Sequence, residues 1–528
     1  MNYKVCILAA GIGSRMGDIY NHVNKAILPV NFKGVISYIV EKFPKETEIV
    51  VAVGHKKETV MDYLSIAYPE RKFSFVAVDR YMGPGTGPGY SLLQCRDLLQ
   101  SPFIFFAADT IVIEDVPVPD KNWFGIAPVK ETEKYCTVKI RNELIYQLDD
   151  KIKTDNKYAF IGLAGVYDYG AFFEALEKNK EPVSGEIQVS NGFKKLIEKK
   201  LVPIGFTWFD TGTFENYAET NKNFSGGEQK FDFSKADGFI YFINGKVIKY
   251  FADPEVTRKR CERARYLKGL VPEIESQKGS FFAYRKIDGN VLYSVLNTQV
   301  VTDFLYWAKT DLWKNPELQE GELEEFRKAC RKFYYDKTMQ RLERFYGKTG
   351  VIDHQNNING ASVPMLKELL EKIDWDYICD GTPVRFHGDL QFDNILVARD
   401  EKSHLQKFIL LDWRQDFGGF MKAGDLYYEL AKLYGGVIIS YQLIKEGMFS
   451  FDTSGSSVYY NYYVKSDLLE AKEEYERFLK RNNFDISKVK ILTSLIFLNM
   501  APLHNDPFDL MLYYLGKSML YKSMKESG

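Results

Sequence analysis

Short apolar runs alternate with amphipathic stretches from residue 3 to about residue 225, and this alternation limits the possible folds more than any other feature. The candidate strands are residues 4–9, 48–53, 73–78, 103–107, 125–129 and 158–166. Residues 35–43 and 58–68 between them have the apolar period of helices. Strands that alternate with helices of this length predict an α/β domain with a Rossmann-like, mainly parallel sheet covered on both faces.

The pattern changes after a polar, glycine-containing stretch at 223–237. Residues 238–295 read as short antiparallel strands with turns at Asn244-Gly245 and Asp288-Gly289, interrupted by a charged helix near 254–268. From about residue 302 the pattern is helical, broken by strand-like runs at 384–412. We therefore predict a first domain at 1–225, a linker at 226–237 and a bilobal (α+β) second domain at 238–528, whose small lobe ends near residue 300 and whose large lobe begins near 301.

Composition excludes several classes of function. The 70 basic and 71 acidic side chains nearly cancel, which argues against a nucleic-acid partner. Six cysteines and six histidines are scattered singly, so a disulfide framework or zinc site is not expected. We find no signal peptide and no run approaching 18 apolar residues, which predicts a cytoplasmic chain without membrane insertion. The oligomeric state is left open.

A glycine-rich loop follows the first candidate strand. The run Leu8-Ala9-Ala10-Gly11-Ile12-Gly13-Ser14-Arg15 lets backbone N–H groups approach a phosphate closely. Its GxGxxxG spacing, with no acidic residue after the next strand for a ribose hydroxyl, disfavours a dinucleotide site. A dinucleotide-binding turn and a purely structural turn remain the alternatives.

The loop and the run NKAILPV at 24–30 together resemble the signature of the sugar nucleotidyltransferase family, which usually has proline at the position of Asn24. Other segments resemble further motifs of this family: FIFFAAD at 103–109, GPGTGPG at 83–89, GEIQ at 185–188 and WFDTGT at 208–213. The family's Glu-Lys pair appears here as Asp150-Lys151, a departure that leaves the acceptor contacts open.

This resemblance implies specific roles. Arg15 and Lys25 would contact the reacting phosphates, Asp109 and Asp210 would hold Mg²⁺, and Lys151 and Glu186 would contact the acceptor. The implied nucleotide-binding residues are Leu8, Ala9, Ala10, Gly11, Gly13, Ser14, Gly85, Thr86 and Gly87. The substrate would be a nucleoside triphosphate, with CTP favoured. Each of these residues, taken alone, could instead have a structural role. Asp109 and Asp210 would then cap strand ends, and Lys25 would be a solvated surface lysine.

A second motif reads HGDLQFDN at 387–394 and is followed by FILLDW at 408–413. Phosphoryl transfer from ATP uses this arrangement: Asp389 would accept the proton of a substrate hydroxyl, and Asn394 and Asp412 would hold Mg²⁺. Lys249 in a strand-like run resembles the phosphate-pairing lysine of a kinase small lobe. Glu262 is its expected ion-pair partner, with Glu255 as the alternative.

The motif is not that of a protein kinase, because the small lobe lacks GxGxxG and Gly388 stands where protein kinases have arginine. With Gly424-Asp425-Leu426 it resembles the aminoglycoside phosphotransferase and choline kinase family, which implies a protein-kinase-like fold and a small-molecule hydroxyl acceptor. His387 is interpreted as structural. The aromatic runs at 458–464 and 499–514 would either cage a quaternary ammonium or form core and groove.

We therefore hypothesise a cytoplasmic bifunctional enzyme for surface polysaccharide synthesis, with small molecules as its partners. It would phosphorylate a small hydroxyl compound with ATP and then transfer a nucleotidyl group to the new phosphate, with Mg²⁺ at both sites. Choline or a related amino alcohol and a sugar phosphorylated at its anomeric carbon compete as acceptors. The alternative from another class is a nucleotide-binding regulatory protein with a degenerate kinase lobe.

Overall fold

The computed structural model describes residues 2–17, 22–225, 237–399 and 406–527. The chain forms two compact units, which are described separately. The first contains the N-terminal domain together with residues up to Pro254 and Glu275–Lys286, and the second contains Glu255–Ile274 and the chain from Ile287 onward. Of the expected linker at 226–237, all but Asp237 lies outside the described residues.

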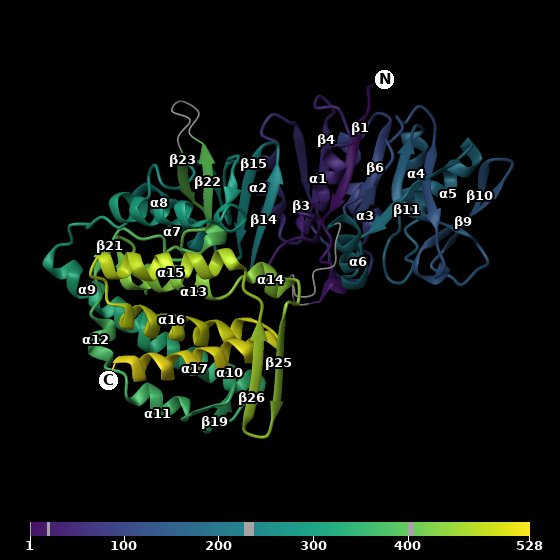
Figure 1. Cartoon of the computed structure of the whole chain (residues 1–528). Helices are drawn as coiled ribbons and strands as arrows, with labels where there is room; N and C mark the ends of the chain where they lie inside the picture. The colour runs from purple at the N-terminus through teal and green to yellow at the C-terminus, as the bar shows by residue number, and fades with distance from the viewer. Residues whose placement is uncertain (1, 18–21, 226–236, 400–405, 528) are drawn as a thin grey trace. The chain divides into compact units, whose positions relative to one another are not determined.

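A nine-stranded mixed sheet forms the centre of the first unit (Figure 1). Its strands are β1 (Lys4–Ala9), β4 (Ile49–Val53), β5 (Phe73–Ala77), β6 (Phe103–Ala107), β8 (Trp123–Pro128), β9 (Cys136–Arg141), β10 (Leu144–Asp150), β11 (Tyr158–Val166) and β12 (Val202–Gly205). The main order is β10-β9-β11-β6-β1-β4-β5, and β8 joins β11 to β12. The strands β6, β1, β4 and β5 are parallel, as predicted, whereas β9, β10 and β11 add an antiparallel edge.

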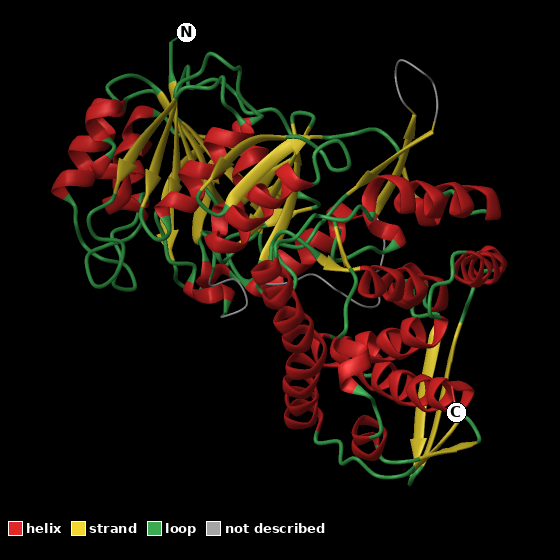
Figure 2. Ribbon diagram, turned by 90° about the vertical axis from the view of Figure 1, so that its left-hand side faces the viewer, coloured by secondary structure: helices red, strands yellow, loops and turns green. Residues whose placement is uncertain are grey.

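Helices cover both faces of this sheet, and Figure 2 shows them in red on either side of the yellow strands. They are α1 (Val35–Val40), α2 (Lys57–Ala67), α3 (Pro88–Gln94), α4 (Tyr169–Lys178), α5 (Ser190–Leu196) and α6 (Phe214–Ser225). Alternate residues of β1 enter different cores: Val5 and Ile7 pack with α1 and α2, and Cys6 packs with α3 and α4. This two-sided burial explains why the central strands are continuous apolar runs, and it confirms the predicted Rossmann-like α/β fold.

A second, four-stranded sheet groups with the first unit except for Ile274, whereas the sequence predicts its strands in the small lobe of the second domain. It contains β14 (Gly238–Ile243), β15 (Lys246–Phe251), β17 (Phe281–Arg285) and β16 (Ile274–Lys278), in that order. The Asn244-Gly245 turn between β14 and β15 forms as predicted, with φ values of 49° and 71°.

Aromatic packing explains this difference from the expected division. Tyr241 of β14 contacts Tyr63 of α2 at 4.8 Å between ring centroids, and Phe281 of β17 contacts the same ring at 6.2 Å. The Tyr241 hydroxyl also donates a hydrogen bond to the Ile27 carbonyl oxygen at 2.9 Å. The apolar face of this sheet therefore continues the core beneath α2, which sequence periodicity alone does not reveal.

The second unit is largely helical, as predicted. Its helices are α7 (Pro254–Tyr266), α8 (Thr298–Trp307), α9 (Glu320–Arg331), α10 (Lys337–Thr349), α11 (Leu366–Glu371), α12 (Trp375–Cys379), α13 (Leu426–Ile438), α14 (Tyr441–Lys445), α15 (Ser466–Arg481), α16 (Ile486–Met500) and α17 (Phe508–Ser527). The hairpin β22 (Ile395–Arg399) and β23 (Gln406–Leu410) interrupts them within the predicted range.

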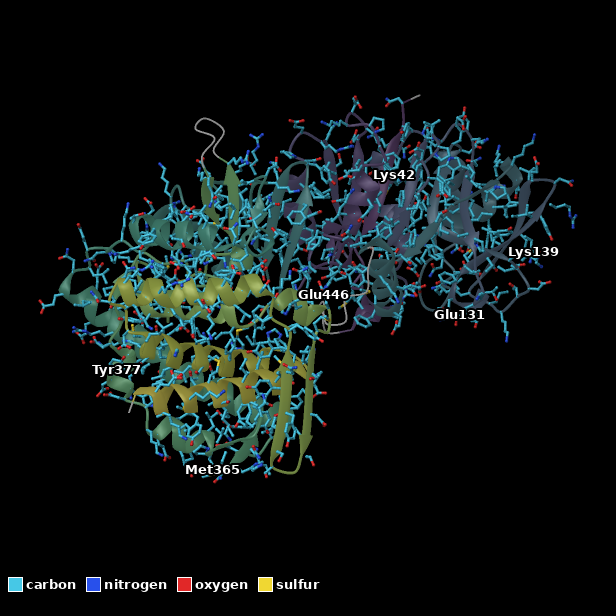
Figure 3. The ribbon with its side chains drawn as sticks, in the orientation of Figure 1. Lys42, Glu131, Lys139, Met365, Tyr377 and Glu446 are labelled. Carbon is cyan, nitrogen blue, oxygen red and sulfur yellow. The ribbon has the colours of Figure 1, made fainter. Side chains whose placement is uncertain are left out.

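A cation–π contact joins two of these helices. The ammonium of Lys488 on α16 lies 5.1 Å from the ring centre of Tyr377 on α12, which is labelled in Figure 3.

The two aromatic runs of the large lobe have different environments. The run at 458–464 contributes to the β25 (Phe449–Ser454) and β26 (Ser457–Tyr462) hairpin, on which Tyr459 is 52% exposed. Phe508 and Tyr513 of α17 are buried among other rings. The rings of α17 are therefore core residues, in agreement with the structural alternative.

One stretch among the described residues is long and apolar enough to cross a membrane, by length and composition. This window, Ile486–Leu503, runs along α16 and was not expected from the sequence. It is 67% buried within the structure, and α16 packs between α13 and α17. Such burial is the pattern of a core helix.

Candidate active sites

The glycine-rich loop of the first unit lies against Lys25. Strand β1 ends at Ala9, and Gly13 adopts a left-handed conformation with φ of 73° before the short helix η1 (Ser14–Met16). A Cβ atom on Gly13 would lie 3.6 Å from Lys25 Cβ. The predicted phosphate loop and the predicted phosphate-binding lysine are therefore neighbours.

Asn24 fixes the start of the short helix η3 (Lys25–Ile27), which carries Lys25. Its side-chain amide donates to the carbonyl oxygens of Ala9 at 2.9 Å and His55 at 2.8 Å. Its Oδ1 atom accepts a hydrogen bond from Ala26 N at 3.0 Å, which caps η3. The residue that departs from the family pattern thus ties Lys25 to the ends of two central strands.

If the resemblance to nucleotidyltransferases holds, we expect an Asn24→Ala variant to lower nucleotidyl transfer about 10- to 100-fold by letting Lys25 move, because small displacements of a positioning group are costly. The two strand-end carbonyls would also lose their donors, which we expect to cost about 1–3 kcal/mol of stability. Steady-state kinetics and thermal unfolding measure both effects. Asn223→Ala, at an exposed position on α6, is the matched control. Unchanged kinetics in Asn24→Ala would contradict this role.

Lys25, Asp109 and Asp210 form one charged cluster. The Lys25 ammonium lies 2.5 Å from Asp109 Oδ2, immediately after β6. Burial opposes ionisation of Asp109, but Lys25 and then Arg15 hold the pKa of its carboxyl below the ordinary value. Burial, followed by the negative charge of Asp109, raises the pKa of Asp210. The structure therefore brings together Arg15, Lys25 and both predicted metal ligands.

Because Gly212 has no side chain, the space between the carboxylates of Asp109 and Asp210 stays open. A Cβ atom at this position would lie 3.0 Å from Asp210 Oδ1 and 3.2 Å from Asp109 Oδ2. Among the described residues no group of three or more His, Cys, Asp or Glu side chains gathers as a metal site. Two carboxylates fit Mg²⁺ in this context, because Mg²⁺ commonly takes one or two carboxylates and completes its shell with phosphates and water.

Three groups that hold Asp210 were not singled out from the sequence. Asn216 Nδ2 donates to Asp210 Oδ2 at 2.6 Å, and Gly212 N donates to Oδ1 at 2.7 Å. The Tyr135 hydroxyl reaches Oδ2 at 3.3 Å. Asn216 lies six residues after Asp210, in the first turn of α6. This short separation was the only sign in the sequence that Asn216 could contact Asp210.

The predicted base loop and acceptor segment are paired with each other. Gly85 N donates to Gly185 O at 3.1 Å, and Ile187 N donates to Thr86 O at 2.7 Å. Gly87 has φ of 117°, and a Cβ atom there would come within 2.8 Å of Glu186 Cβ, so only glycine fits.

The two predicted acceptor residues also meet. Lys151 Nζ lies 3.7 Å from Glu186 Oε2. The predicted base loop and the predicted acceptor residues are therefore neighbours in the first unit.

In the second unit, Asp389 is bound by residues from two directions. Its Oδ1 atom lies 2.8 Å from the ammonium of Lys432, a residue on α13 that is 6% exposed. Asn394 Nδ2 donates to the Asp389 carbonyl oxygen at 2.8 Å and lies 3.4 Å from Oδ2. Desolvation opposes ionisation, but Lys432 and then Arg414 hold the pKa of Asp389 well below its ordinary value. Asp389 is therefore a carboxylate at neutral pH.

Asn394 and Asp412 lie at the same end of the β22–β23 hairpin, since Leu411 N donates to Asn394 O at 2.8 Å. Asp412 has φ of 60°, a strained conformation for a non-glycine residue and one that functional sites often contain. The Arg260 guanidinium lies 3.5 Å from Asp412 Oδ1. The structure thus brings Asp389, Asn394 and Asp412 to one place in the second unit.

The two small-lobe residues lie in different units. Lys249 is on β15 of the first unit and is 3% exposed. Glu262 is on α7 of the second unit and accepts a hydrogen bond from Arg258 at 2.8 Å. Glu255 also pairs with Arg258, at 2.7 Å. The ion pair expected between Lys249 and Glu262 remains a prediction.

Buried Glu429 holds the loop that carries Asp389. Its carboxylate accepts hydrogen bonds from His387 N at 2.8 Å and Gly388 N at 2.7 Å. His387 is fully buried, its Nε2 atom lies 2.7 Å from Leu411 O, and burial lowers its pKa to about 4. A neutral His387 that joins two loop segments supports its structural interpretation.

Glu429 predicts a pH-dependent stability. Burial raises its pKa from 4.5 to about 7. Between these values the unfolded chain has released the proton that the folded chain retains, so the unfolding free energy falls as pH rises, by about 3 kcal/mol in total. Buried His387, whose pKa is lowered to about 4, contributes the opposite slope over nearly the same range. Relative to the unmodified chain, Glu429→Gln should therefore make the unfolding free energy rise more steeply with pH in denaturant titrations between pH 4.5 and 7. Glu473→Gln, at an exposed position, should leave the slope unchanged; an equal slope in both variants would exclude Glu429 as its source.

Comparison with known proteins finds similarities in the N-terminal part of the chain. Residues 5–116 match the MobA-like NTP transferase domain. The bifunctional protein GlmU of Methanococcus vannielii is 29% identical over 219 residues, which cover 39% of this chain and 51% of that protein. Choline-phosphate cytidylyltransferase of Streptococcus pneumoniae is 35% identical over 107 residues, which cover 20% of this chain and 44% of that protein.

Among solved structures, UDP-glucose pyrophosphorylase complexed with UDP-glucose is 21% identical, with a TM-score of 0.38, and the match covers 43% of this chain and 99% of that chain. The chain spans about half the length of the curated relatives that it matches first.

Proposed function

We propose that the first unit transfers a nucleotidyl group from a nucleoside triphosphate to a phosphate monoester and releases pyrophosphate. The cluster of Lys25, Arg15, Asp109 and Asp210 beside the glycine-rich loop is the observation that carries this proposal. The NTP transferase match at residues 5–116 supports it independently.

In this reaction an oxygen of the acceptor phosphate attacks the α-phosphorus while the bond to the pyrophosphate oxygen breaks. No covalent enzyme intermediate is needed. Rate acceleration therefore comes from orienting the two substrates and from neutralising the charge of their phosphates. Arg15 and Lys25 neutralise phosphate oxygens, and Asn24 keeps Lys25 in position. Mg²⁺, when held by Asp109 and Asp210, would neutralise further phosphate charge.

For the second unit we propose transfer of the γ-phosphoryl group of ATP to a small-molecule hydroxyl. The convergence of Asp389, Asn394 and Asp412 supports this proposal. Asp389 would accept the hydroxyl proton, while Asn394 and Asp412 would hold Mg²⁺ on the phosphates. The product, a phosphate monoester, is the class of compound that the first unit consumes, so the two reactions form a sequence.

The acceptor phosphate determines which nucleotide-activated product the first unit would make. Sugar and choline phosphates are both possible acceptors for a nucleotidyltransferase. One relative is named for choline phosphate, whereas the name of the bifunctional protein GlmU states neither acceptor. Lys151 and Glu186 supply one cation and one anion beside the base loop. We propose a nucleotide-activated building block for a surface polysaccharide, made in the cytoplasm.

Product analysis tests both activities. The full-length chain is incubated with ATP, Mg²⁺, each nucleoside triphosphate in turn and a panel of sugars, sugar acids and amino alcohols. Mass spectrometry should detect a phosphate monoester and its nucleotide-activated form, with release of pyrophosphate. If neither ADP nor pyrophosphate forms with any acceptor or supplied phosphate ester, the alternative of a nucleotide-binding regulator is favoured.

A further inference from the structure

Four basic side chains form one cluster in the second unit: Lys337, Arg341, Arg414 and Lys432. Lys337, Arg414 and Lys432 interact electrostatically with Asp389, and Arg341 interacts with Lys337 and Arg414. Lys432 contacts Asp389 directly at 2.8 Å. Lys337 Nζ lies 3.9 Å from the centre of the Phe333 ring, and the Arg414 guanidinium carbon lies 5.2 Å from the same centre. Arg341 follows Lys337 by four residues on α10, so both side chains leave the same face of the helix.

Few negative charges balance this cluster. The acidic groups that act on it include Asp389 and Asp416, and Asp416 is itself paired with Lys259 at 3.3 Å. Burial and then the charges of Arg414, Arg341 and Lys432 lower the pKa of Lys337 to about 6. Like charges four residues apart on a helix repel each other, and an anion bound beside Lys337 and Arg341 would relieve this repulsion and favour the charged form of Lys337.

Arg341 provides an independent observation. Its Nη1 atom is buried and has no hydrogen-bond partner among the residues that the structure describes. A buried guanidinium donor is normally hydrogen-bonded, and its planar fork matches a carboxylate or phosphate. The neighbouring Arg344 adds positive charge rather than a partner.

We propose that the acceptor of the second unit carries an anionic group, a carboxylate or a phosphate, beside the hydroxyl that is phosphorylated, and that Lys337 and Arg341 bind this group. The inference rests on the phosphotransfer proposed above. A quaternary ammonium is disfavoured, because the neighbouring positive charges of Arg341, Arg414 and Lys432 would repel it.

The chemistry is that of an ordinary phosphoryl transfer. The acceptor hydroxyl oxygen forms a bond to the γ-phosphorus of ATP, the bond from this phosphorus to the β–γ bridging oxygen breaks, and ADP leaves. The hydroxyl proton moves to the Asp389 carboxylate. Lys337 and Arg341 take no proton in this step; they hold the anionic end of the acceptor so that its hydroxyl faces Asp389.

Matched acceptors test the inference through ADP release by the full-length chain. Glycerol, glycerate, glycerol 3-phosphate and choline differ in charge but share a small hydroxyl-bearing frame. We expect kcat/KM for one of the two anions to exceed that for glycerol or choline by about tenfold or more, as a charged hydrogen bond provides. Use of choline or glycerol with rejection of both anions would overturn the inference and leave the proposed kinase activity intact.

Variants identify the residues. Lys337→Met and Arg341→Gln should each raise KM for the anionic acceptor about 10- to 100-fold without changing KM for ATP. Lys337→Arg should restore most of the loss, and Lys332→Met, at an exposed position one turn earlier, is the matched control. A rise in KM for ATP instead would assign the cluster to the nucleotide and refute an acceptor role.

A binding measurement separates this inference from the proposed activity. Inorganic phosphate is titrated calorimetrically into the full-length chain carrying Lys25→Met, which weakens phosphate binding in the first unit. If binding persists and is lost on adding Lys337→Met or Arg341→Gln, the anion site is supported even where no acceptor consumes ATP. If neither substitution changes phosphate binding, the inference fails whatever the chain phosphorylates.

Discussion

An Asp389→Ala variant is expected to lose ATP-dependent phosphorylation about 10²- to 10⁴-fold, because general-base catalysis contributes this much to proton transfer from a hydroxyl. Nucleotidyl transfer from a supplied phosphate ester should stay at the level of the unmodified chain, since Asp389 belongs to the second unit. ADP release and pyrophosphate release, measured on one preparation, give the two values. Asp288→Ala, at an exposed position, is the control.

Loss of folding must be separated from loss of the base. Removing the carboxylate leaves the Lys432 ammonium, 6% exposed, without its partner at 2.8 Å. We expect this to cost about 1–2 kcal/mol, less than for a fully buried pair because the Asp389 side chain is 39% exposed. Asp389→Asn keeps the shape of the side chain and should show the same loss of phosphorylation. Phosphorylation that survives in Asp389→Asn would refute its role as base.

Most of the sheet in the first unit was predictable, because each central strand is buried on both faces and is therefore a continuous apolar run. Residues 4–9, 103–107 and 158–166 match β1, β6 and β11 at both ends. The other predicted strands differ by one or two residues at their ends. The grouping of the β14–β17 sheet with the first unit was not predicted, because Tyr241 and Phe281 signal burial but not the partner against which they pack.

The candidate sites were predictable only as far as their local motifs. Asp389, Asn394 and Asp412 stand at a recognisable spacing, and the structure brings them together. Lys432 and Glu429 were not found, because they lie about 40 residues away on α13 and contact the loop only in the folded chain. The available signal was weak: a lysine and a glutamate within a helix that is otherwise almost entirely buried.

For Asn24 the reverse holds. The sequence singles out this residue as a departure from the family pattern but does not show what its side chain does. Its backbone, with φ of −70° and ψ of 140°, is one that proline also adopts, so the usual family residue fits the same conformation. Proline fixes such a backbone through its ring. Asn24 fixes it through three side-chain hydrogen bonds, which cannot be inferred from a one-letter difference.

An Asp109→Ala variant should show the reverse pattern of Asp389→Ala. We expect nucleotidyl transfer to fall about 10²- to 10³-fold, a typical loss when one preorganised charge is removed from a phosphate site. ATP-dependent phosphorylation by the second unit should be unchanged. Asp115→Ala, at an exposed position shortly after β7 (Thr110–Val112), is the matched control.

The loss in Asp109→Ala has a specific electrostatic signature. Without Asp109, Lys25 loses its partner at 2.5 Å and Asp210 loses the neighbouring negative charge that raises its pKa. Because the variant also lacks one of the two carboxylates proposed to hold Mg²⁺, it should need a higher Mg²⁺ concentration for half-maximal pyrophosphate release, whereas Asp115→Ala should not. Loss of both activities in Asp109→Ala would mean that the two reactions are not independent, and unchanged pyrophosphate release would remove Asp109 from the site.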